Sequence, residues 1–146
     1  MSSTLQLRQP HYIGPVFDEA KVHDAMRVGV VTCRPDTSLK DVARIMVGYQ
    51  IHSVVIGDIG AGDRLWGIVT DLDIAGASGS DLSGIQAKDV ASTELVTVAA
   101  DETLERAAQL MTEHEVSHLL AVQPETGQPV GVISALGIAA VLAAER

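Results

Sequence analysis

The feature that most constrains the fold is an internal repeat that starts near Lys21 and occupies the rest of the chain. Equivalent residues recur at a spacing of 65, among them Asp24 and Asp89, Leu39 and Leu104, and Met46 and Met111. After a one-residue deletion in a loop the spacing becomes 64, so that Gly67-Ile68-Val69-Thr70 matches Gly131-Val132-Ile133-Ser134. The chain therefore carries two copies of one unit, preceded by an extension.

Each copy has the pattern of a β-α-β-β-α unit. A brief strand, at 28–32 or 95–98, leads to a helix with apolar residues at i, i+3, i+4 and i+7. The N-cap candidates of these helices are Asp36 or Thr37 in the first copy and Asp101 or Thr103 in the second. Two apolar runs follow and predict an antiparallel hairpin in each copy, with 53–56 and 65–69 in the first and 119–122 and 130–133 in the second. A last helix begins at Thr70 or Ser134.

The predicted class is α+β, with the two repeats sharing one core. A unit of roughly 60 residues is marginal on its own, so we expect the repeats to pack sheet to sheet about a pseudo-twofold axis. This packing would leave two clefts suited to small ligands. The predicted division is an N-terminal extension at 1–20, a first repeat at 21–77, a flexible linker at 78–85 and a second repeat at 86–146.

Charge and composition narrow the functional classes. The formal net charge of −9 argues against nucleic acid and anionic membranes as partners, since both require clustered Lys and Arg. The single cysteine, Cys33, excludes a disulfide framework within the chain and a cysteine-rich metal site. No segment has the length of a signal peptide's apolar run or of a membrane span, so we expect a soluble cytoplasmic protein.

The passage from strand to helix at Thr70 carries the main functional signal. Thr70 occupies an N-cap position and Asp73 follows three residues later, so the two side chains share the first turn. They have two possible roles, either capping the helix or holding a hydroxylated ligand. The second copy reads Ser134-Ala135-Leu136-Gly137 and has glycine in place of the carboxylate. Because Ser134 could cap its helix alone, the sequence leaves the capping alternative open.

The chain resembles a tandem pair of cystathionine-β-synthase (CBS) domains, known as a Bateman module, over about residues 21 to 144. The resemblance depends on the order and duplication of three segments. They are Val22-His23-Asp24-Ala25-Met26, then Gln50-Ile51-His52-Ser53-Val54-Val55 with its counterpart Glu115-Val116-Ser117-His118-Leu119-Leu120, and Gly67-Ile68-Val69-Thr70-Asp71-Leu72-Asp73.

The resemblance implies a non-catalytic regulatory module that binds an adenosyl ligand, such as AMP, ADP, ATP or S-adenosylmethionine, in the clefts between the repeats. Thr70 would contact phosphate or ribose and Asp73 the ribose diol, with backbone N–H groups of the helix facing a phosphate. The remaining residues of this cleft would be Ile68, Val96, Val116, Ser117 and His118. A degenerate second cleft, lacking the diol acceptor, would be formed by Ser134, Val31, Ile51 and His52.

The family also implies assembly and an effector. We expect a homodimer, to which the apolar final helix would contribute Ile138, Val141 and Leu142, and a partner protein whose identity the sequence does not specify. No cofactor is required beyond the regulatory adenosyl ligand. Arg34, in a turn near a cleft, is the one candidate for a phosphate contact.

Two other functions remain as alternatives. The first is a protein-interaction scaffold that binds no ligand. The second is a zinc-dependent hydrolase, because His114-Glu115-Val116-Ser117-His118 matches the H-E-x-x-H pattern. That pattern requires both histidines on one helix, whereas the repeat places His114 at a helix end and His118 at the start of a strand. Four extended residues would separate the imidazoles by roughly 13 Å, too far for one ion.

Overall fold

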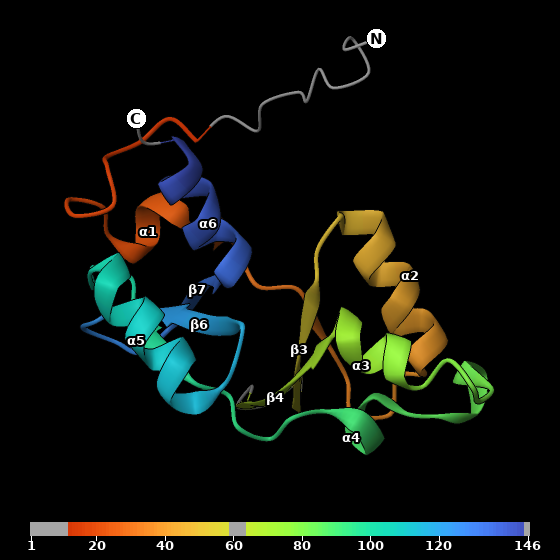
Figure 1. Ribbon diagram of the computed structural model, residues 1–146. Helices are drawn as coiled ribbons and strands as arrows, with labels where there is room; N and C mark the ends of the chain where they lie inside the picture. Colours follow the sequence, from red (N-terminus) through yellow and green to blue (C-terminus); the bar gives the residue numbers. More distant parts are fainter. Residues whose placement is uncertain (1–11, 59–63, 145–146) are drawn as a thin grey trace, which may run out of the picture. The chain divides into compact units, whose positions relative to one another are not determined.

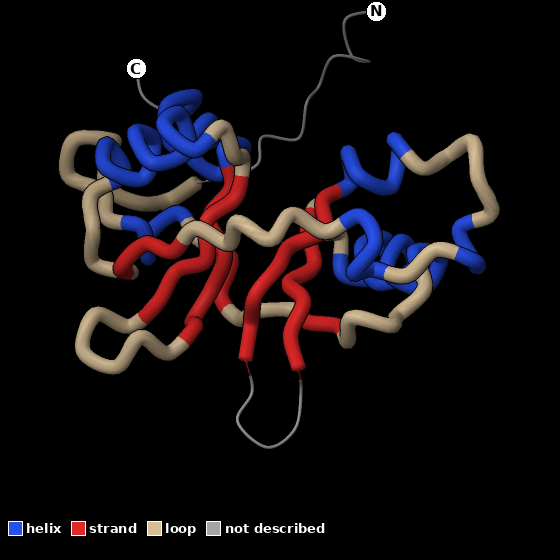
Figure 2. The backbone as a smooth tube through the Cα atoms, turned by 90° about the horizontal axis from the view of Figure 1, so that it is seen from below, coloured by secondary structure: helices blue, strands red, loops and turns tan. Residues whose placement is uncertain are grey.

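The computed structural model describes residues 12–58 and 64–144, and the chain forms two compact units. Among the described residues, unit 2 comprises 29–58 and 64–96, and unit 1 combines 12–28 with 97–144. Each unit has one sheet with helices against it (Figures 1 and 2), which confirms the α+β class. Residues 1–11 of the predicted extension and 59–63 of the predicted hairpin loop lie outside the described residues.

The sheet of unit 2 has three strands in the order β2-β3-β4. Strand β2 (Thr32–Cys33) pairs in parallel with β3 (Ser53–Asp58), and β3 pairs antiparallel with β4 (Arg64–Thr70), as the hairpin prediction required. The helical elements of unit 2 are α2 (Leu39–Tyr49), α3 (Asp71–Gly76), the 3₁₀ helix η2 (Leu82–Gly84) and α4 (Ala87–Val90).

The sheet of unit 1 has four strands in the order β1-β7-β6-β5. Its strands are β1 (Arg27–Val28), β5 (Thr97–Ala99), β6 (His118–Val122) and β7 (Pro129–Ser134). Its helices are α1 (Val22–Ala25), α5 (Leu104–His114) and α6 (Ala135–Ala144). Strand β6 pairs in parallel with β5 and antiparallel with β7, so the strand pairings of unit 2 recur here.

The longer helix of each unit follows directly from its sequence. Helix α2 buries Leu39, Val42 and Met46 on one face, and α5 buries their counterparts. The amide of Asp41 donates to Ser38 Oγ at 3.2 Å, and the amide of Arg106 donates to Thr103 Oγ1 at 3.1 Å. Thr103 was among the predicted caps. In the first copy the cap is Ser38, the residue that the 65-residue spacing aligns with Thr103, and the prediction of Asp36 or Thr37 was wrong.

Each repeat contributes its leading segment to the unit formed by the other repeat. In unit 1 the amide of Val22 donates to the Glu102 carbonyl at 2.8 Å. In unit 2 the amide of Ala87 donates to the Thr37 carbonyl at 2.7 Å. In sequence, each leading segment belongs to its own repeat. In the folded chain, it belongs to the compact unit that the rest of the other repeat forms.

The single strand predicted over 28–32 is wrong, because the chain forms two short strands there. Strand β1 ends at Val28 and pairs with β7, whereas β2 begins at Thr32 and pairs with β3. Gly29 between them has a φ of 87°, a left-handed conformation that glycine adopts without strain. The predicted linker also has structure, since it contains η2 and its Leu82 and Ile85 pack against the core of unit 2.

Candidate functional site

The candidate site lies at the junction of β4 and α3 in unit 2, where Thr70 is the N-cap of the helix. Asp73 Oδ2 accepts the backbone N–H of Thr70 at 2.8 Å and the Thr70 hydroxyl at 3.2 Å. The first bond is the carboxylate half of a capping box, so the capping alternative accounts for one of the two contacts. Both bonds end on Oδ2, and no other described residue donates to Oδ1. One carboxylate oxygen of Asp73 is therefore left for a further donor.

The start of α3 is the segment expected to present its N–H groups to a phosphate. The helix has six residues, and the first of its amides already has a partner. The amide of Asp71 donates to the His52 carbonyl at 3.0 Å, so it is not available to a ligand. Phosphate binding by the amides that follow stays a prediction.

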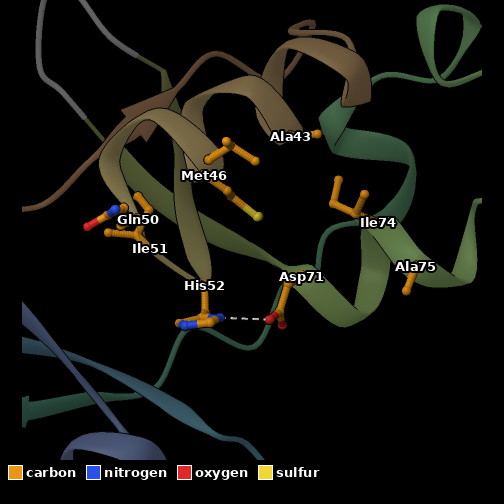
Figure 3. Close-up of a pocket in the computed structure, with 9 residues that line it drawn as sticks. Ala43, Met46, Gln50, Ile51, His52, Asp71, Ile74 and Ala75 are labelled. Atoms are coloured by element: carbon orange, nitrogen blue, oxygen red, sulfur yellow. Dashed lines mark hydrogen bonds and ion pairs between the residues drawn. The ribbon is translucent and has the colours of Figure 1, made fainter. Parts of the chain in front are cut away.

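A groove between α2 and α3 opens beside this junction and encloses about 730 Å³ (Figure 3). Its lining is mostly apolar and has three polar side chains, Gln50, His52 and Asp71. The apolar members come from α2, from the residue that follows its C-cap and from α3, and they are Ala43, Met46, Val47, Ile51, Ile74 and Ala75. The groove has the size and composition of a small-molecule site.

His52 and Asp71 form the polar edge of this groove. His52 Nδ1 lies 2.8 Å from Asp71 Oδ2, and each side chain is 58% exposed. The pair joins the chain just before β3 to the first residue of α3, and Figure 3 shows the two side chains facing each other. The sequence did not single out Asp71, although its position beside Thr70 on a turn that already carries Asp73 was a usable signal.

The other predicted residues are divided between the two units. Unit 2 contains Ile68, Val96, Val31, Ile51 and His52, and unit 1 contains Val116, Ser117, His118 and Ser134. Within unit 2, Thr70 is the register partner of Ser53, the residue that follows His52. The structure thus brings Ile51 and His52 close to Thr70, although the prediction assigned them to the other cleft. The complete composition of either cleft stays a prediction.

Unit 1 has the same junction without the carboxylate. The hydroxyl of Ser134 accepts the amide of Gly137 at 3.0 Å, so serine alone caps α6, as the sequence suggested. A Cβ atom built on Gly137 would lie 3.0 Å from the carbonyl oxygen of Ala25. That separation is tighter than ordinary van der Waals contact, so the packing of α1 against α6 favours glycine here.

The residues of the zinc alternative do not form a metal site. His114 is the last residue of α5, Glu115 follows with a φ of 54°, and His118 begins β6. Among the described residues no three His, Cys, Asp or Glu side chains are grouped so that they could hold a metal ion. This arrangement gives no support to a hydrolase of the H-E-x-x-H type.

The structure gives the burial and contacts of the predicted dimer residues, of Arg34 and of Cys33, while a phosphate contact by Arg34 stays a prediction. Ile138 and Val141 are buried, so of the proposed dimer residues only Leu142, 48% exposed, lies at the surface. Arg34 is exposed and its Nε lies 3.5 Å from Asp36 Oδ1. Cys33 is buried, and this burial raises the pKa of its thiol.

Within 12–58 and 64–144, no helix combines the length and the apolar character needed to cross a membrane.

Comparison with known proteins begins with a family model. The model described as "CBS domain" matches the chain twice, at residues 22–80 and 87–144. The curated relatives are named homoserine O-acetyltransferase. That of Methanosalsum zhilinae is 29% identical over 88% of this chain, and that of Methanohalophilus mahii is 31% identical over 94%. The chain spans only about a quarter of their length, 25% and 28% respectively.

Solved structures share the fold at lower identity. The CBS domain pair of protein MJ0100, in complex with 5-methylthioadenosine and S-adenosyl-L-methionine, has a TM-score of 0.75 and is 22% identical, over 90% of this chain and 100% of that one. The CBS-domain protein ATU1752 of Agrobacterium tumefaciens has a TM-score of 0.74 at 21% identity, over 90% and 98%. A hexameric CBS-CP12 protein from cyanobacteria has a TM-score of 0.72 at 23% identity, over 82% and 66%.

Proposed function

Because the chain belongs to the CBS domain family, we propose that it is a non-catalytic regulatory module that binds an adenosyl compound and signals to an effector protein. Two findings support this proposal. The chain has the fold of a CBS pair whose solved complex contains S-adenosylmethionine and methylthioadenosine. Its first repeat also has a hydroxyl and a carboxylate, Thr70 and Asp73, where the Thr/Ser-x-x-Asp pattern of the family requires them.

The observation that carries the proposal is the fixed orientation of the Asp73 carboxylate. Two hydrogen bonds from Thr70 hold Oδ2, while Oδ1 accepts none from the described residues. A carboxylate oriented in this way is ready to accept from a ribose hydroxyl without losing much further side-chain freedom. Each charge-assisted bond of this kind contributes about 1.5–3 kcal/mol. Capping and ligand binding are therefore compatible roles of the same side chain.

The second repeat is proposed to lack a competent site. Gly137 replaces the carboxylate, and the nearby Ala25 carbonyl disfavours any side chain at that position. We therefore expect one adenosyl molecule per chain, bound through Thr70 and Asp73.

The nature of the effector is suggested by the relatives. In the homoserine O-acetyltransferases, the region similar to this chain is only a quarter of a longer protein. This supports a regulatory role beside an enzyme, whether in the same polypeptide or in another. A bound ligand would act on that enzyme only if the ligand has different affinities for two conformational states of the module.

A homodimer remains part of the proposal, on a revised surface. Leu72 and Leu136 occupy equivalent positions of the two repeats and are 77% and 65% exposed. The same large apolar side chain is thus displayed by both units, and Leu142 on α6 adds to it. Exposed apolar residues at related positions suit an interface with a second copy of the chain.

The test compares two variants that lose the same capping contact. Asp89 Oδ2 accepts the Gln86 amide at 2.9 Å, as Asp73 Oδ2 accepts the Thr70 amide at 2.8 Å. Asp73→Ala and Asp89→Ala should therefore both lower the free energy of unfolding, by about 1 kcal/mol. Titration calorimetry with S-adenosylmethionine, methylthioadenosine, AMP and ATP should show a loss of affinity of about tenfold or more in Asp73→Ala alone.

Two results would count against the proposal. Equal affinities of Asp73→Ala and wild type would remove Asp73 from the site. If wild type binds none of the four compounds, the alternative of a ligand-free interaction scaffold gains support. Thermal unfolding gives an independent reading, since a compound at a hundred times its dissociation constant should add about 2.7 kcal/mol of stability.

A further inference from the structure

The groove between α2 and α3 is a cavity that the proposed adenosyl site does not use. The described residues that line it include Asp71 but neither Thr70 nor Asp73. Residues two apart in a helix lie about 200° apart around its axis, so Asp71 and Asp73 point to opposite sides of α3. The groove is therefore separate from the carboxylate that is proposed to hold a ribose.

The groove is open because α3 is short. Helix α3 ends at Gly76 after six residues and buries none of them, whereas α6 has ten residues and buries Ile138 and Val141. The counterparts of these two residues in unit 2 are Ile74, which is half-buried and lines the groove, and the smaller Ala77. Helix α3 therefore covers less apolar surface than α6 does, and the uncovered surface forms the lining of the groove.

The polar edge of the groove can accept hydrogen bonds. His52 Nδ1 lies 2.8 Å from Asp71 Oδ2, and because an ionised carboxylate only accepts, Nδ1 is the donor. In a neutral imidazole the other nitrogen, Nε2, is then an acceptor. Within the part of the chain that the structure describes, no group donates to His52 Nε2 or to Asp71 Oδ1. Gln50 lines the same groove and can add a third acceptor through its amide oxygen.

Size and charge define the class of molecule that fits. The volume of about 730 Å³ lies within the range of about 300–1,000 Å³ that is usual for small-molecule pockets. The described lining has one carboxylate, that of Asp71, and neither lysine nor arginine. An anionic group placed here would meet this carboxylate without a compensating cation, whereas a cationic donor would be attracted to it.

We propose that the groove is a second ligand site of the chain, for a small amphiphilic molecule with an apolar body and a primary ammonium group. The ammonium group donates to Asp71 Oδ1 and His52 Nε2, and the apolar body contacts Met46, Ile51 and Ile74. A primary ammonium has three N–H donors and, like the lysine side chain, is protonated at neutral pH. This site goes beyond the proposed function, because it involves no adenosyl ligand.

The test uses octylamine, octanol and octanoate, which have the same apolar chain and differ in the end group. Titrations followed by the amide chemical shifts of the protein should show octylamine binding most tightly, about three- to fivefold more tightly than octanol, and octanoate most weakly. Asp71→Asn keeps the size of the side chain and should remove the advantage of octylamine. Asp41→Asn is the matched control, because Asp41 is also 58% exposed and also paired, with Arg44 Nη1 at 3.1 Å, but lies outside the groove.

A second pair of variants tests the location. Ala43 lines the groove, and its counterpart in α5 is Ala108, which is also half-buried. Ala43→Leu fills part of the groove and should weaken all three probes by about tenfold, whereas Ala108→Leu should weaken none. In wild type the largest shifts should fall on residues 43–52 and 71–75.

Four results would overturn this proposal. They are the absence of binding by any probe, an octylamine advantage that Asp71→Asn retains, equal affinities of Ala43→Leu and wild type, and an oligomer that Ala43→Leu alone dissociates in sedimentation. The last result would assign the groove to a second copy of the chain. The proposed function is tested separately, with adenosyl compounds and Asp73→Ala, and none of these four results bears on it.

Discussion

Gly137 offers a direct test of why the second repeat lacks its carboxylate. Glycine costs a helix about 1 kcal/mol relative to alanine, so Gly→Ala substitutions in helices stabilise a protein wherever space allows. Gly48 in α2 provides the reference, because a Cβ atom there would meet nothing within 4 Å. We expect Gly48→Ala to raise the free energy of unfolding by up to about 1 kcal/mol.

The same substitution at Gly137 should not stabilise the protein. Its Cβ would lie 3.0 Å from the Ala25 carbonyl oxygen, a backbone atom of the last residue of α1. Overpacking of this kind costs about 1–3 kcal/mol, which offsets or exceeds the gain of about 1 kcal/mol in helix propensity. The net change expected for Gly137→Ala therefore lies between about zero and a loss of about 2 kcal/mol.

Urea unfolding of wild type, Gly48→Ala and Gly137→Ala gives the comparison. The dependence of the free energy of unfolding on urea concentration must be the same in all three proteins. Equal stabilisation by the two substitutions would show that position 137 has room for a side chain and would refute the steric argument. If the argument holds, Gly137→Asp should not create a second site, and calorimetry should still give one ligand per chain.

Three further predictions concern the fold. Leu39→Ala, which empties a fully buried position at the start of α2, should lower the free energy of unfolding by about 2–5 kcal/mol in chemical denaturation. Ser38→Ala removes the cap of the same helix and should cost about 1 kcal/mol, whereas a change below the error of the unfolding curves would exclude a capping role. Because burial raises the pKa of Cys33, the folded thiol holds its proton where the unfolded thiol ionises. The contribution of Cys33 to stability should therefore be complete below the ordinary thiol pKa and decline as the pH rises through it. Cys33→Ala should abolish this alkaline decline, and native protein should alkylate far more slowly than protein in denaturant.

The repeat made most of the architecture predictable from sequence. Apolar residues at helical spacing located α2 and α5, and the apolar runs located both hairpins, because these elements depend on local patterns. The same alignment would have identified Ser38 as a cap, since its counterpart is Thr103. What the pattern could not supply was the division of 28–32 between two sheets. That division depends on which strands the chain meets after folding.

The site was predictable in part for the same reason. Thr70 and Asp73 stand out because they are neighbours along the chain with a recognisable spacing. The contact between His52 Nδ1 and Asp71 Oδ2 joins residues 19 apart in sequence, and the pairing of β3 with β4 brings them together. The steric reason for glycine at position 137 could not be predicted from the sequence either. The atom that restricts this position is the carbonyl oxygen of Ala25, a residue far earlier in the chain.

The capping bonds of Asp73 do not by themselves identify a ligand site, because two other aspartates of the chain make them as well. Asp24 and Asp89 accept the amides of Lys21 and Gln86 at 2.8 and 2.9 Å. What distinguishes Asp73 is its surroundings, namely a hydroxyl at the cap, an adjacent groove and a second carboxylate held by His52. A helix cap requires none of these three features, which set Asp73 apart from Asp24 and Asp89. The three aspartates should therefore contribute similarly to stability, while only Asp73 affects ligand binding.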